Sequence, residues 1–365
     1  MNEPTYILGV ESSCDETAAA IVADGEFVLS NVVSTQIDMH ARFGGVVPEI
    51  ASRAHIEAIN SVIDESFSRA GVKPSQIKAV AVTCEPGLIG SLLVGLMAAK
   101  TLSWAWNIPL IGVNHVYAHA YAAALRLAGQ QKQAAIEYPA VALICSGGHT
   151  ALYRVKSPLD MELMGTTIDD AAGEAFDKVA SILGLGYPGG PIVEKVARDG
   201  NPAAVNFPRA LLEGQSLDFS FSGLKTAVLY HVNGLPENPR RKDKPQPQPT
   251  YAGRGKGSQN MTPQEIADVA AGFQAAVIDV LRIKLRRAVN VTGAKAIIIG
   301  GGVSANSALR QAAGELAGKM HCRLCLPAME FCVDNGAMIA GLGYHYLLGG
   351  RISELDLEAR ATVRR

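Results

Sequence analysis

The chain has 365 residues, of which 48% are hydrophobic and 18% are charged. This is ordinary globular composition, so gross disorder is excluded, and the length is enough for two domains with separate cores. The 33 basic and 34 acidic residues leave a net charge of -1, which excludes a global electrostatic attraction to nucleic acid or to a membrane.

The N-terminal segment predicts a β-hairpin. Residues 7–10 and 18–22 are apolar strands, and the turn between them is Glu11-Ser12-Ser13-Cys14-Asp15-Glu16-Thr17. Hydroxyls and carboxylates at a hairpin tip suit a phosphate or its metal, although a solvated tip has the same composition. The chain enters this hairpin without a basic or apolar leader, so we expect a cytoplasmic protein with no membrane association.

Strands then alternate with helices. A loop rich in glycine leads at Pro48 into a helix that runs to about residue 70, and residues 78–83 and 109–113 are buried strands. The apolar run at 86–99 is too short to span a bilayer before Lys100 interrupts it, so we expect a buried helix there. This alternation is typical of an α/β domain.

Two histidines follow in the stretch Asn114-His115-Val116-Tyr117-Ala118-His119. On a helix, His115 and His119 would lie one turn apart on one face and could share a metal ion. A divalent cation needs negative charge as well, and Asp334 is our candidate for the third ligand. Two alternatives stay open: the histidines line a buried helix, or Asp334 only caps the last helix.

A second unit of strand, turn and strand repeats the first. Residues 138–145 and 151–155 are strands, and the turn between them is Ser146-Gly147-Gly148-His149-Thr150. We interpret the pair of units as an internal duplication. Two such turns facing each other could enclose the phosphates of a nucleotide, because glycine lets backbone N–H groups approach anions closely; a simple tight hairpin is the alternative.

Several later residues are candidates for binding. Asp177 lies too far inside a predicted helix to be a cap, and Gly190 lies in a glycine loop before a helix start, which suits an anion or a sugar. Lys225 could contact a phosphate or simply be solvated. A glycine turn after the strand at 294–299 leads to Asn306, whose amide could contact a purine or ribose.

The segment 233–259 breaks the α/β pattern. It is rich in proline and glycine and holds six basic against two acidic residues, so we predict a flexible basic loop that either contacts a polyanion or only adds solubility. Residues 262–291 predict a capped helix. The spacing of Cys322 and Cys325 allows zinc, but the segment also alternates like a strand.

Taken together, these stretches resemble the TsaD family, the bacterial tRNA N6-adenosine threonylcarbamoyltransferases once called O-sialoglycoprotein endopeptidases. The resemblance implies the duplicated α/β fold of actin and sugar kinases, with the active site in the cleft between two lobes. We expect an N-terminal lobe at 1–136 joined by a returning C-terminal helix at 334–365, and a C-terminal lobe at 137–333 with a basic insertion at 233–260. The matching motifs, in chain order, are GVESSCDET, GGVVPEIASRAH, HVYAH, SGGHT, DDAAGEAFDK, YPGGP, DFSFSGLKTAV, GGGVSAN and DNGAMIA.

The resemblance also implies a site. His115, His119 and Asp334 match the metal ligands, usually for one Fe²⁺ per subunit, with zinc possible. The residues expected to hold threonylcarbamoyl-adenylate are Ile144, Cys145, Ser146, Gly147, Gly148, Asp177, Gly190 and Asn306, to which we add Glu194. Three features depart from the family pattern: Glu85 before Pro-Gly-Leu, Phe43 in place of tyrosine, and the long basic loop.

The activity implied is transfer of the threonylcarbamoyl group to the N6 amine of adenosine 37, in tRNAs that read codons beginning with A, with release of AMP. TsaB-like and TsaE-like proteins are the implied partners. Three rivals stay open: a metal-dependent peptidase, a small-molecule kinase of the same fold, and a nucleotide-gated scaffold. Against the peptidase, Val116 and Tyr117 occupy the positions where HExxH would place its glutamate.

Overall fold

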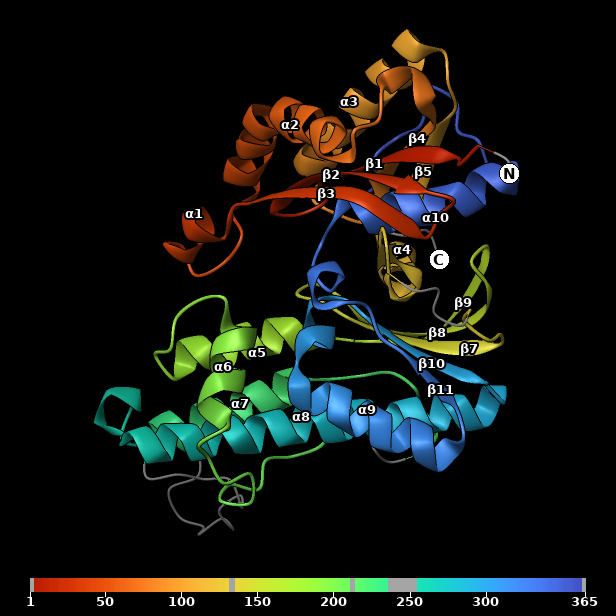
Figure 1. The fold of residues 1–365 in the computed structure, drawn as a ribbon. Coiled ribbons are helices and arrows are strands. Elements are labelled where there is room, and N and C mark those ends of the chain that lie inside the picture. The colour runs from red at the N-terminus through yellow and green to blue at the C-terminus, as the bar shows by residue number, and fades with distance from the viewer. Residues whose placement is uncertain (1–2, 131–134, 211–213, 236–254, 363–365) are drawn as a thin grey trace.

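The computed structural model describes residues 3–130, 135–210, 214–235 and 255–362. Two β-sheets organise the chain, one in each lobe (Figure 1). The first sheet has the strand order β5-β4-β1-β2-β3-β6 and the second has β11-β10-β7-β8-β9. The strands of the first sheet are β1 (Tyr6–Glu11), β2 (Glu16–Ala23), β3 (Phe27–Thr35), β4 (Ile77–Glu85), β5 (Leu110–Asn114) and β6 (Arg126–Leu127). Those of the second are β7 (Ala140–Cys145), β8 (Thr150–Ser157), β9 (Asp160–Thr166), β10 (Ala296–Gly300) and β11 (Arg323–Cys325).

The two sheets repeat one pattern of pairing. In the first sheet β1 and β3 flank β2 in antiparallel fashion, while β4 and β5 extend the other side in parallel. In the second sheet β7, β8 and β9 pair antiparallel, and β10 and β11 follow in parallel. Thus β1 to β5 correspond in order to β7 to β11, which confirms the predicted duplication and the α/β fold with two lobes.

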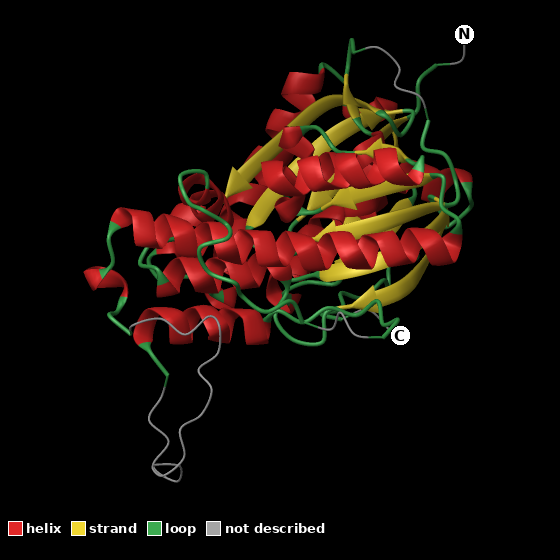
Figure 2. Cartoon of the chain, turned by 90° about the horizontal axis from the view of Figure 1, so that it is seen from below, coloured by secondary structure: helices red, strands yellow, loops and turns green. Residues whose placement is uncertain are grey.

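The helices cover both faces of each sheet. They are α1 (Ile37–Ala41), α2 (Pro48–Ala70), α3 (Ile89–Trp106), α4 (His115–Tyr121), α5 (Ala172–Ile182), α6 (Gly189–Ala197), α7 (Ser222–Asn233), α8 (Pro263–Thr292), α9 (Ser307–Met320) and α10 (Gly336–Leu348). Helices α2 and α3 pack on the outer face of the first sheet, and α10 packs on its inner face. Helices α5 to α9 lie beyond the second sheet; Figure 2 shows helices lying across its strands from below.

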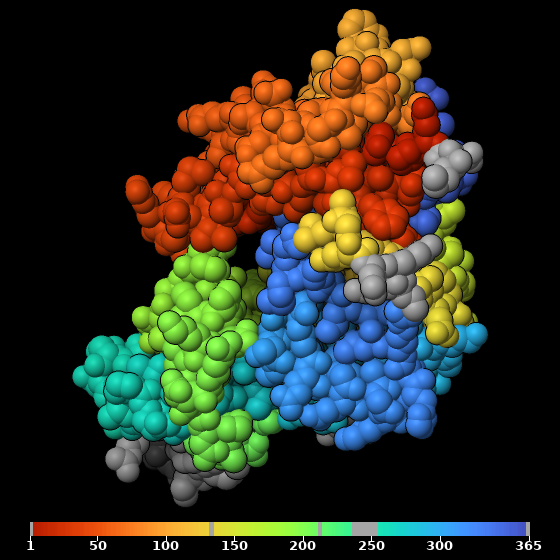
Figure 3. All heavy atoms as spheres, in the orientation of Figure 1, coloured from red at the N-terminus to blue at the C-terminus, as the bar shows by residue number. Residues whose placement is uncertain are grey.

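Helix α4 lies in the layer between the two sheets, where it contacts α10 as well as β7 and β10 (Figure 1). Separate apolar clusters fill the outer and inner faces of both sheets. The space-filling view shows the lobes stacked in contact, with C-terminal residues in blue next to both (Figure 3). Any side chain that α4 presents to α10 is therefore held between two apolar layers.

The central strands were predictable, and three outer ones, β3, β6 and β9, were missed. The expected strands at 7–10, 18–22, 78–83, 109–113, 138–145, 151–155 and 294–299 correspond to β1, β2, β4, β5, β7, β8 and β10. Strand β3 alternates between buried and less buried positions, and β9 is an edge strand with mostly accessible residues. Neither strand has the continuous apolar run by which buried strands are recognised.

Two helix predictions need correction. The expected C-terminal helix at 334–365 is wrong in length, because α10 ends at Leu348 and Gly350 adopts a φ of 70°. Helix α3 was expected to be buried, but only 33% of Ile89–Trp106 is buried. By length and composition alone this helix is long and apolar enough to cross a membrane. Its Leu93, Met97 and Trp104 are exposed at 44%, 56% and 74%.

Elsewhere the capped helix expected at 262–291 is α8, where Thr262 and Glu265 form the capping box. Most of the basic insertion, residues 236–254, lies outside the described residues. The lobe boundaries at 136 and 333 stay predictions.

The packing of α10 on β1 depends on glycine. A Cβ added at Gly9 would lie 2.2 Å from the carbonyl oxygen of Gly336 and 2.5 Å from the amide nitrogen of Ala340. We predict that Gly9→Ala destabilises the protein by about 2 kcal/mol or more, because backbone must move to admit the methyl group. Gly318→Ala is the control: its Cβ meets nothing within 4 Å, so about 0.5–1 kcal/mol of stabilisation is expected. Urea unfolding measures both; equal midpoints would contradict the prediction.

Candidate metal centre

The two histidines are presented by the start of α4. Strand β5 brings the chain to Asn114, whose side chain accepts hydrogen bonds from the backbone N–H groups of Val116 and Tyr117 at 3.0 and 3.1 Å. Asn114 thus caps the helix, and His115 is its first residue. The rings of His115 and His119 stand edge to face with centroids 4.6 Å apart. Both side chains are buried.

Asp334 completes the group from the other end of the chain. The side chain that caps α10 belongs to Asn335, which accepts from the N–H of Met338 at 2.9 Å, so the alternative that Asp334 is only a cap is wrong. Oδ1 of Asp334 lies 3.4 Å from Nε2 of His115 and 3.0 Å from Nε2 of His119. One ligand atom from each residue falls within 4.8 Å of the others. We call these three residues the His-His-Asp cluster.

A fourth residue, Glu11, holds the cluster from behind. Its side chain is fully buried at the end of β1, and Oε2 lies 2.9 Å from Nδ1 of His115. The hydroxyl of Thr83 donates to the same oxygen at 2.6 Å, and the N–H of Ser13 donates to Oε1 at 2.5 Å. A carboxylate on the second nitrogen of a metal-binding imidazole orients the ring and fixes its tautomer.

The charges of the cluster are strongly coupled. Burial alone disfavours a charged His115, but Asp334 and Glu11 outweigh it and raise the pKa of His115 well above the ordinary value. Burial likewise opposes charge on Asp334, yet His115 and His119 hold the pKa of Asp334 well below its usual range. Burial lowers the pKa of His119, which is therefore neutral. Two carboxylates, the fully buried Glu11 and the half-buried Asp334, thus enclose a single positive charge.

The donor set fits a divalent cation. Two imidazoles and one carboxylate, with further positions left for other ligands, are the set known from non-haem iron sites, and zinc accepts the same atoms. The two carboxylates already require a cation between them, which a metal would supply in place of the proton on His115. Nδ1 of His119 is buried and has no hydrogen-bond partner among the described residues. The cluster can therefore hold a metal ion.

The hairpin tip expected to bind a phosphate or metal lies near this cluster. Burial, followed by the charges of Asp334 and Asp15, raises the pKa of Glu16 to about 10, so Glu16 is protonated at neutral pH. The turn after β7 approaches from the second lobe. Burial and the neighbouring His115 and His119 lower the pKa of its His149 to about 4, so this third imidazole is neutral.

The turn after β7 divides into buried and open residues. Ile144 and Cys145 are fully buried in the apolar clusters on opposite faces of the second sheet, so only their backbone can meet a ligand. Ser146 donates its N–H to the carbonyl of His149 at 2.8 Å and closes the turn. A Cβ added at Gly147 or Gly148 would meet nothing within 4 Å. These two glycines leave open space for a ligand.

Asp177 and Gly190 meet at the start of α6. Oδ1 of Asp177 accepts the N–H of Gly189 at 2.7 Å. Burial raises the pKa of Asp177, although the N–H groups of Gly189 and Gly190 act to lower it. A Cβ added at Gly189 would lie 2.5 Å from Cα of Asp177, whereas Gly190 has open space. Gly189 thus serves packing, and Gly190 stays free for a ligand.

Asn306 and Glu194 already have partners in the protein. The carboxamide oxygen of Asn306 caps α9 by accepting from Leu309 at 3.0 Å, and its nitrogen donates to Gln274 at 2.8 Å. Oε1 of Glu194 accepts from the N–H and the hydroxyl of Ser307, at 3.0 and 2.5 Å. Both side chains help to place α9, and a ligand would use only their remaining hydrogen-bonding capacity.

Two further expectations are answered by the structure. Lys225, suggested for a phosphate, lies 3.1 Å from Asp170 and is paired with it. Cys322 directly precedes β11 and Cys325 is its last residue, and the thiol of Cys322 donates to the carbonyl of Ala294 at 3.1 Å. In the parts of the chain that the structure describes, only the His-His-Asp cluster groups three such ligands. The strand alternative to zinc is therefore correct.

Sequence reasoning missed Glu11 and His149. Glu11 ends a continuous apolar strand, and a carboxylate in such a place needs a buried partner, which is a usable signal. His149 lies inside the Ser-Gly-Gly-His-Thr turn, but a single histidine in a turn gives no indication of which distant ring it faces.

The chain is similar to known proteins along nearly its whole length. A model of the TsaD family, described as tRNA N6-adenosine threonylcarbamoyltransferase, matches residues 27–341. The protein of that name from Thermomicrobium roseum is 50% identical, over 97% of this chain and 95% of the relative. The protein of that name from Desulforapulum autotrophicum is 48% identical, over 98% of this chain and 99% of the relative.

Solved structures add evidence on the fold. Full-length HypF in a phosphate- and nucleotide-bound form is 13% identical, with a TM-score of 0.57 over 98% of this chain and 47% of that one. Component A of the (R)-2-hydroxyglutaryl-CoA dehydratase of Acidaminococcus fermentans is 14% identical, with a TM-score of 0.50. The match covers 94% of this chain and 99% of that one. At these identities the likeness supports the duplicated fold with two lobes and nothing further.

The contact between Glu11 and His115 gives a test by metal binding. We predict that Glu11→Gln weakens binding of Co²⁺ by about 10- to 100-fold, because the amide no longer orients the ring as an anionic acceptor. Thr83→Val is the matched control, since it removes another hydrogen bond to Glu11 but leaves the contact with His115. Isothermal titration calorimetry measures both; equal losses would show that Glu11 acts only through general packing.

Proposed function

The chain belongs to the TsaD family of tRNA N6-adenosine threonylcarbamoyltransferases and is an acyltransferase that modifies tRNA, and we propose that the His-His-Asp cluster is its catalytic metal centre. The observation that carries this proposal is the meeting of His115 and His119 with Asp334, which lies more than 200 positions further along the chain, with one ligand atom from each within 4.8 Å of the others. A peptidase or a small-molecule kinase is not favoured, because the matched family and relatives are named as transferases.

We propose one Fe²⁺ per subunit, bound by both imidazoles and the carboxylate. When bound, the metal supplies Lewis-acid polarisation of a carbonyl or holds the threonyl moiety. The protein contributes the rest. Glu11 keeps the ring of His115 in place, and Asn114 and Asn335 cap the two helices so that the ligand side chains stay free of capping roles.

We propose threonylcarbamoyl-adenylate as the donor, held between the lobes by residues 144–148, Asp177, Gly190, Glu194 and Asn306. The open space at Gly147, Gly148 and Gly190 supports this proposal, since a ligand can approach the backbone N–H groups there. Because the side chains of Ile144 and Cys145 are buried, their part is to place the turn. The part of Asn306 and Glu194 is to fix the start of α9 through their hydrogen bonds.

In the proposed reaction the N6 amine of adenosine 37 attacks the carbamoyl carbonyl of the donor. The new N–C bond forms as the bond from that carbon to the phosphate oxygen breaks. AMP leaves, and the proton lost by the N6 amine passes to solvent. An amine conjugated to a purine is a weak nucleophile, so alignment and electrostatic stabilisation of the carbonyl oxygen carry the rate. No side chain near the cluster is assigned as general base.

The site also sets a condition on the donor. Asp15 and Asp177 contribute negative charge from the two lobes, and each acts on Tyr187, whose pKa is raised first by burial and then by their charge. An anionic donor entering between these carboxylates needs positive charge to offset them. A divalent metal in place of the proton on His115 would add one unit of positive charge at the cluster, which supports the pairing of metal and adenylate.

The remaining assignments follow from the family. We propose a cytoplasmic enzyme that acts with TsaB-like and TsaE-like proteins on tRNAs reading codons that begin with A. The basic insertion around residues 233–260, with its six basic residues, is a candidate for contact with the tRNA backbone.

The role of the cluster is tested by removing single ligands. We predict that His119→Ala and Asp334→Asn lower the rate of threonylcarbamoyl transfer to tRNA by about 100-fold or more, because carbonyl polarisation is lost with the metal. Asp356→Asn, on the exposed C-terminal segment, is the matched control and keeps full activity. The measurement uses radiolabelled threonylcarbamoyl-adenylate, purified partners and tRNA with adenosine at position 37. Full activity of both ligand variants would leave the metal a structural role only.

The donor site is tested separately at Gly147. A Cβ added there meets nothing within 4 Å, so we predict that Gly147→Val changes the melting temperature little but weakens donor binding by about tenfold through a clash with the ligand. Gly318→Val on α9, also in open space, is the control. Equilibrium binding of a non-hydrolysable adenylate analogue measures the effect, and unchanged affinity would remove this turn from the donor site.

A further inference from the structure

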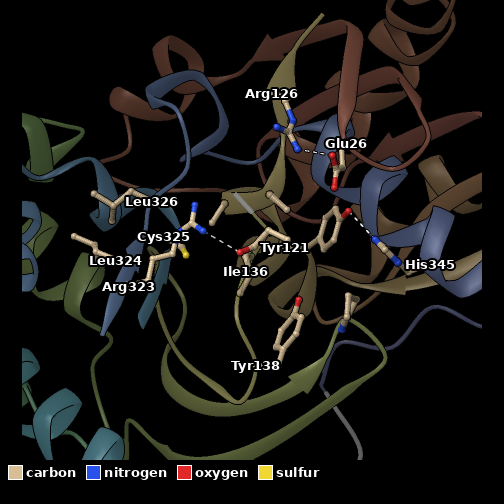
Figure 4. Close-up of a pocket in the computed structure, with 14 residues that line it drawn as sticks. Glu26, Tyr121, Arg126, Ile136, Tyr138, Arg323, Leu324, Cys325, Leu326 and His345 are labelled. Atoms are coloured by element: carbon tan, nitrogen blue, oxygen red, sulfur yellow. Dashed lines mark hydrogen bonds and ion pairs between the residues drawn. The ribbon is translucent and has the colours of Figure 1, made fainter. Parts of the chain in front are cut away.

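A cavity of about 470 Å³ lies at the junction of the two lobes, where α4 and α10 end (Figure 4). We call it the junction cavity. Its wall includes Tyr121 at the end of α4, Ala123 and Ala124 just beyond, and His345 near the end of α10. None of the residues that line it belongs to the proposed catalytic site. The volume is within the range of small-molecule sites, about 300–1,000 Å³.

The wall contains a buried arginine with unused hydrogen-bonding capacity. Arg126 is only 4% exposed, and its Nη2 is paired with Glu26. The guanidinium lies over the ring of Phe27 at 5.3 Å. Its Nε and Nη1 are buried and have no hydrogen-bond partner among the described residues. Buried donors in native proteins are nearly always paired. These two nitrogens lack an acceptor among the described residues, and because they are covered, the guanidinium must turn toward the cavity to present them to a ligand.

The remaining wall defines the chemistry of that acceptor. Arg323 adds a second positive charge and donates to the carbonyl of Ala135 at 3.0 Å. Burial lowers the pKa of His345, so it stays neutral and shares a hydrogen bond of 2.8 Å with Tyr121. With Glu26 as the one carboxylate, the lining carries a single net positive charge. Apolar groups fill much of the rest, from Ala123, Ala124, Ile136, Tyr138 and Pro158.

We propose that the junction cavity binds a small organic carboxylate, whose anionic group accepts hydrogen bonds from Arg126 and whose apolar body lies against Ala124, Ile136 and Pro158. A single negative charge matches the single net positive charge of the wall, which favours a carboxylate over a dianionic phosphate. The apolar lining requires a hydrocarbon or aromatic body, because a bare ion would leave that surface uncovered.

The position of the cavity gives its occupant an effect on the His-His-Asp cluster. Helix α4 carries His119 one half-turn before Tyr121, and α10 runs from the residues next to Asp334 to His345. The hydrogen bond between Tyr121 and His345 joins the far ends of these two helices. A ligand that alters this contact therefore alters the relative position of the metal ligands. This coupling rests on the proposed metal centre, whereas binding in the cavity does not.

The binding test uses the full chain and a fluorinated probe. 4-(Trifluoromethyl)benzoate and its neutral amide have nearly the same shape, so we expect the acid to bind at least about tenfold more tightly by ¹⁹F NMR titration. Arg126→Gln should abolish that preference, and the exposed Arg69→Gln on α2 should keep it. Equal binding of acid and amide, or full preference in Arg126→Gln, would overturn the proposal.

Two additions keep the test decisive. If Arg126→Gln fails to fold, Ala124→Phe keeps both residues of the ion pair, places a large ring in the cavity and should abolish binding; retained binding would place the probe elsewhere. Inorganic phosphate should not displace the acid, and full displacement would overturn the preference for a carboxylate. Titrating Co²⁺ with and without saturating acid tests the coupling, because any change in metal affinity must be matched by the same change in acid affinity. An unchanged metal affinity would remove the coupling and leave the binding site.

Discussion

The structure depends on the pairing of two carboxylates, one fully buried and one half-buried, with one imidazole. Glu11 and Asp334 both reach His115, at 2.9 and 3.4 Å. An ionised Glu11 could not be buried alone, because an unpaired buried charge costs several kcal/mol. Positive charge is therefore a condition of this fold, whether a proton on His115 or a metal ion supplies it. The same condition makes the centre selective for cations.

Close backbone contacts bring the elements of the centre together. A Cβ at Gly300 would lie 2.3 Å from the carbonyl oxygen of His119, and one at Gly301 would lie 2.4 Å from that of Cys145. The end of β10 therefore packs directly on α4 and β7, and Gly301 also adopts a positive φ of 84°. The sequence predicts that this glycine turn and Asn306 after it approach a purine or ribose. Two of its three glycines are explained by packing within the protein, and only Gly302 has open space.

Features that depend on residues close together in the sequence were predictable, and features that depend on distant residues were not. Local pattern was sufficient for the central strands, for the helix that carries His115 and His119, and for the duplication. The assignment of Asp334 as a partner needed the chemistry of metals and the family resemblance, since nothing local links it to His115. Glu11 was missed because its role depends on a contact across 104 positions. Strands β3 and β9 were missed because a half-buried strand has no continuous apolar run.

The two asparagine caps show why the ligands and the fold are separable. In each helix the residue beside the metal ligand meets the needs of the backbone: Asn114 accepts from Val116 and Tyr117, and Asn335 accepts from Met338. The ligand side chains are then left without a structural hydrogen bond to their own helix. Loss of His119 should therefore affect chemistry more than folding. Loss of His115 also removes the partner of the buried Glu11, and loss of a cap should affect both chemistry and folding. This division lets a single layer of the protein combine a rigid scaffold with a reactive centre.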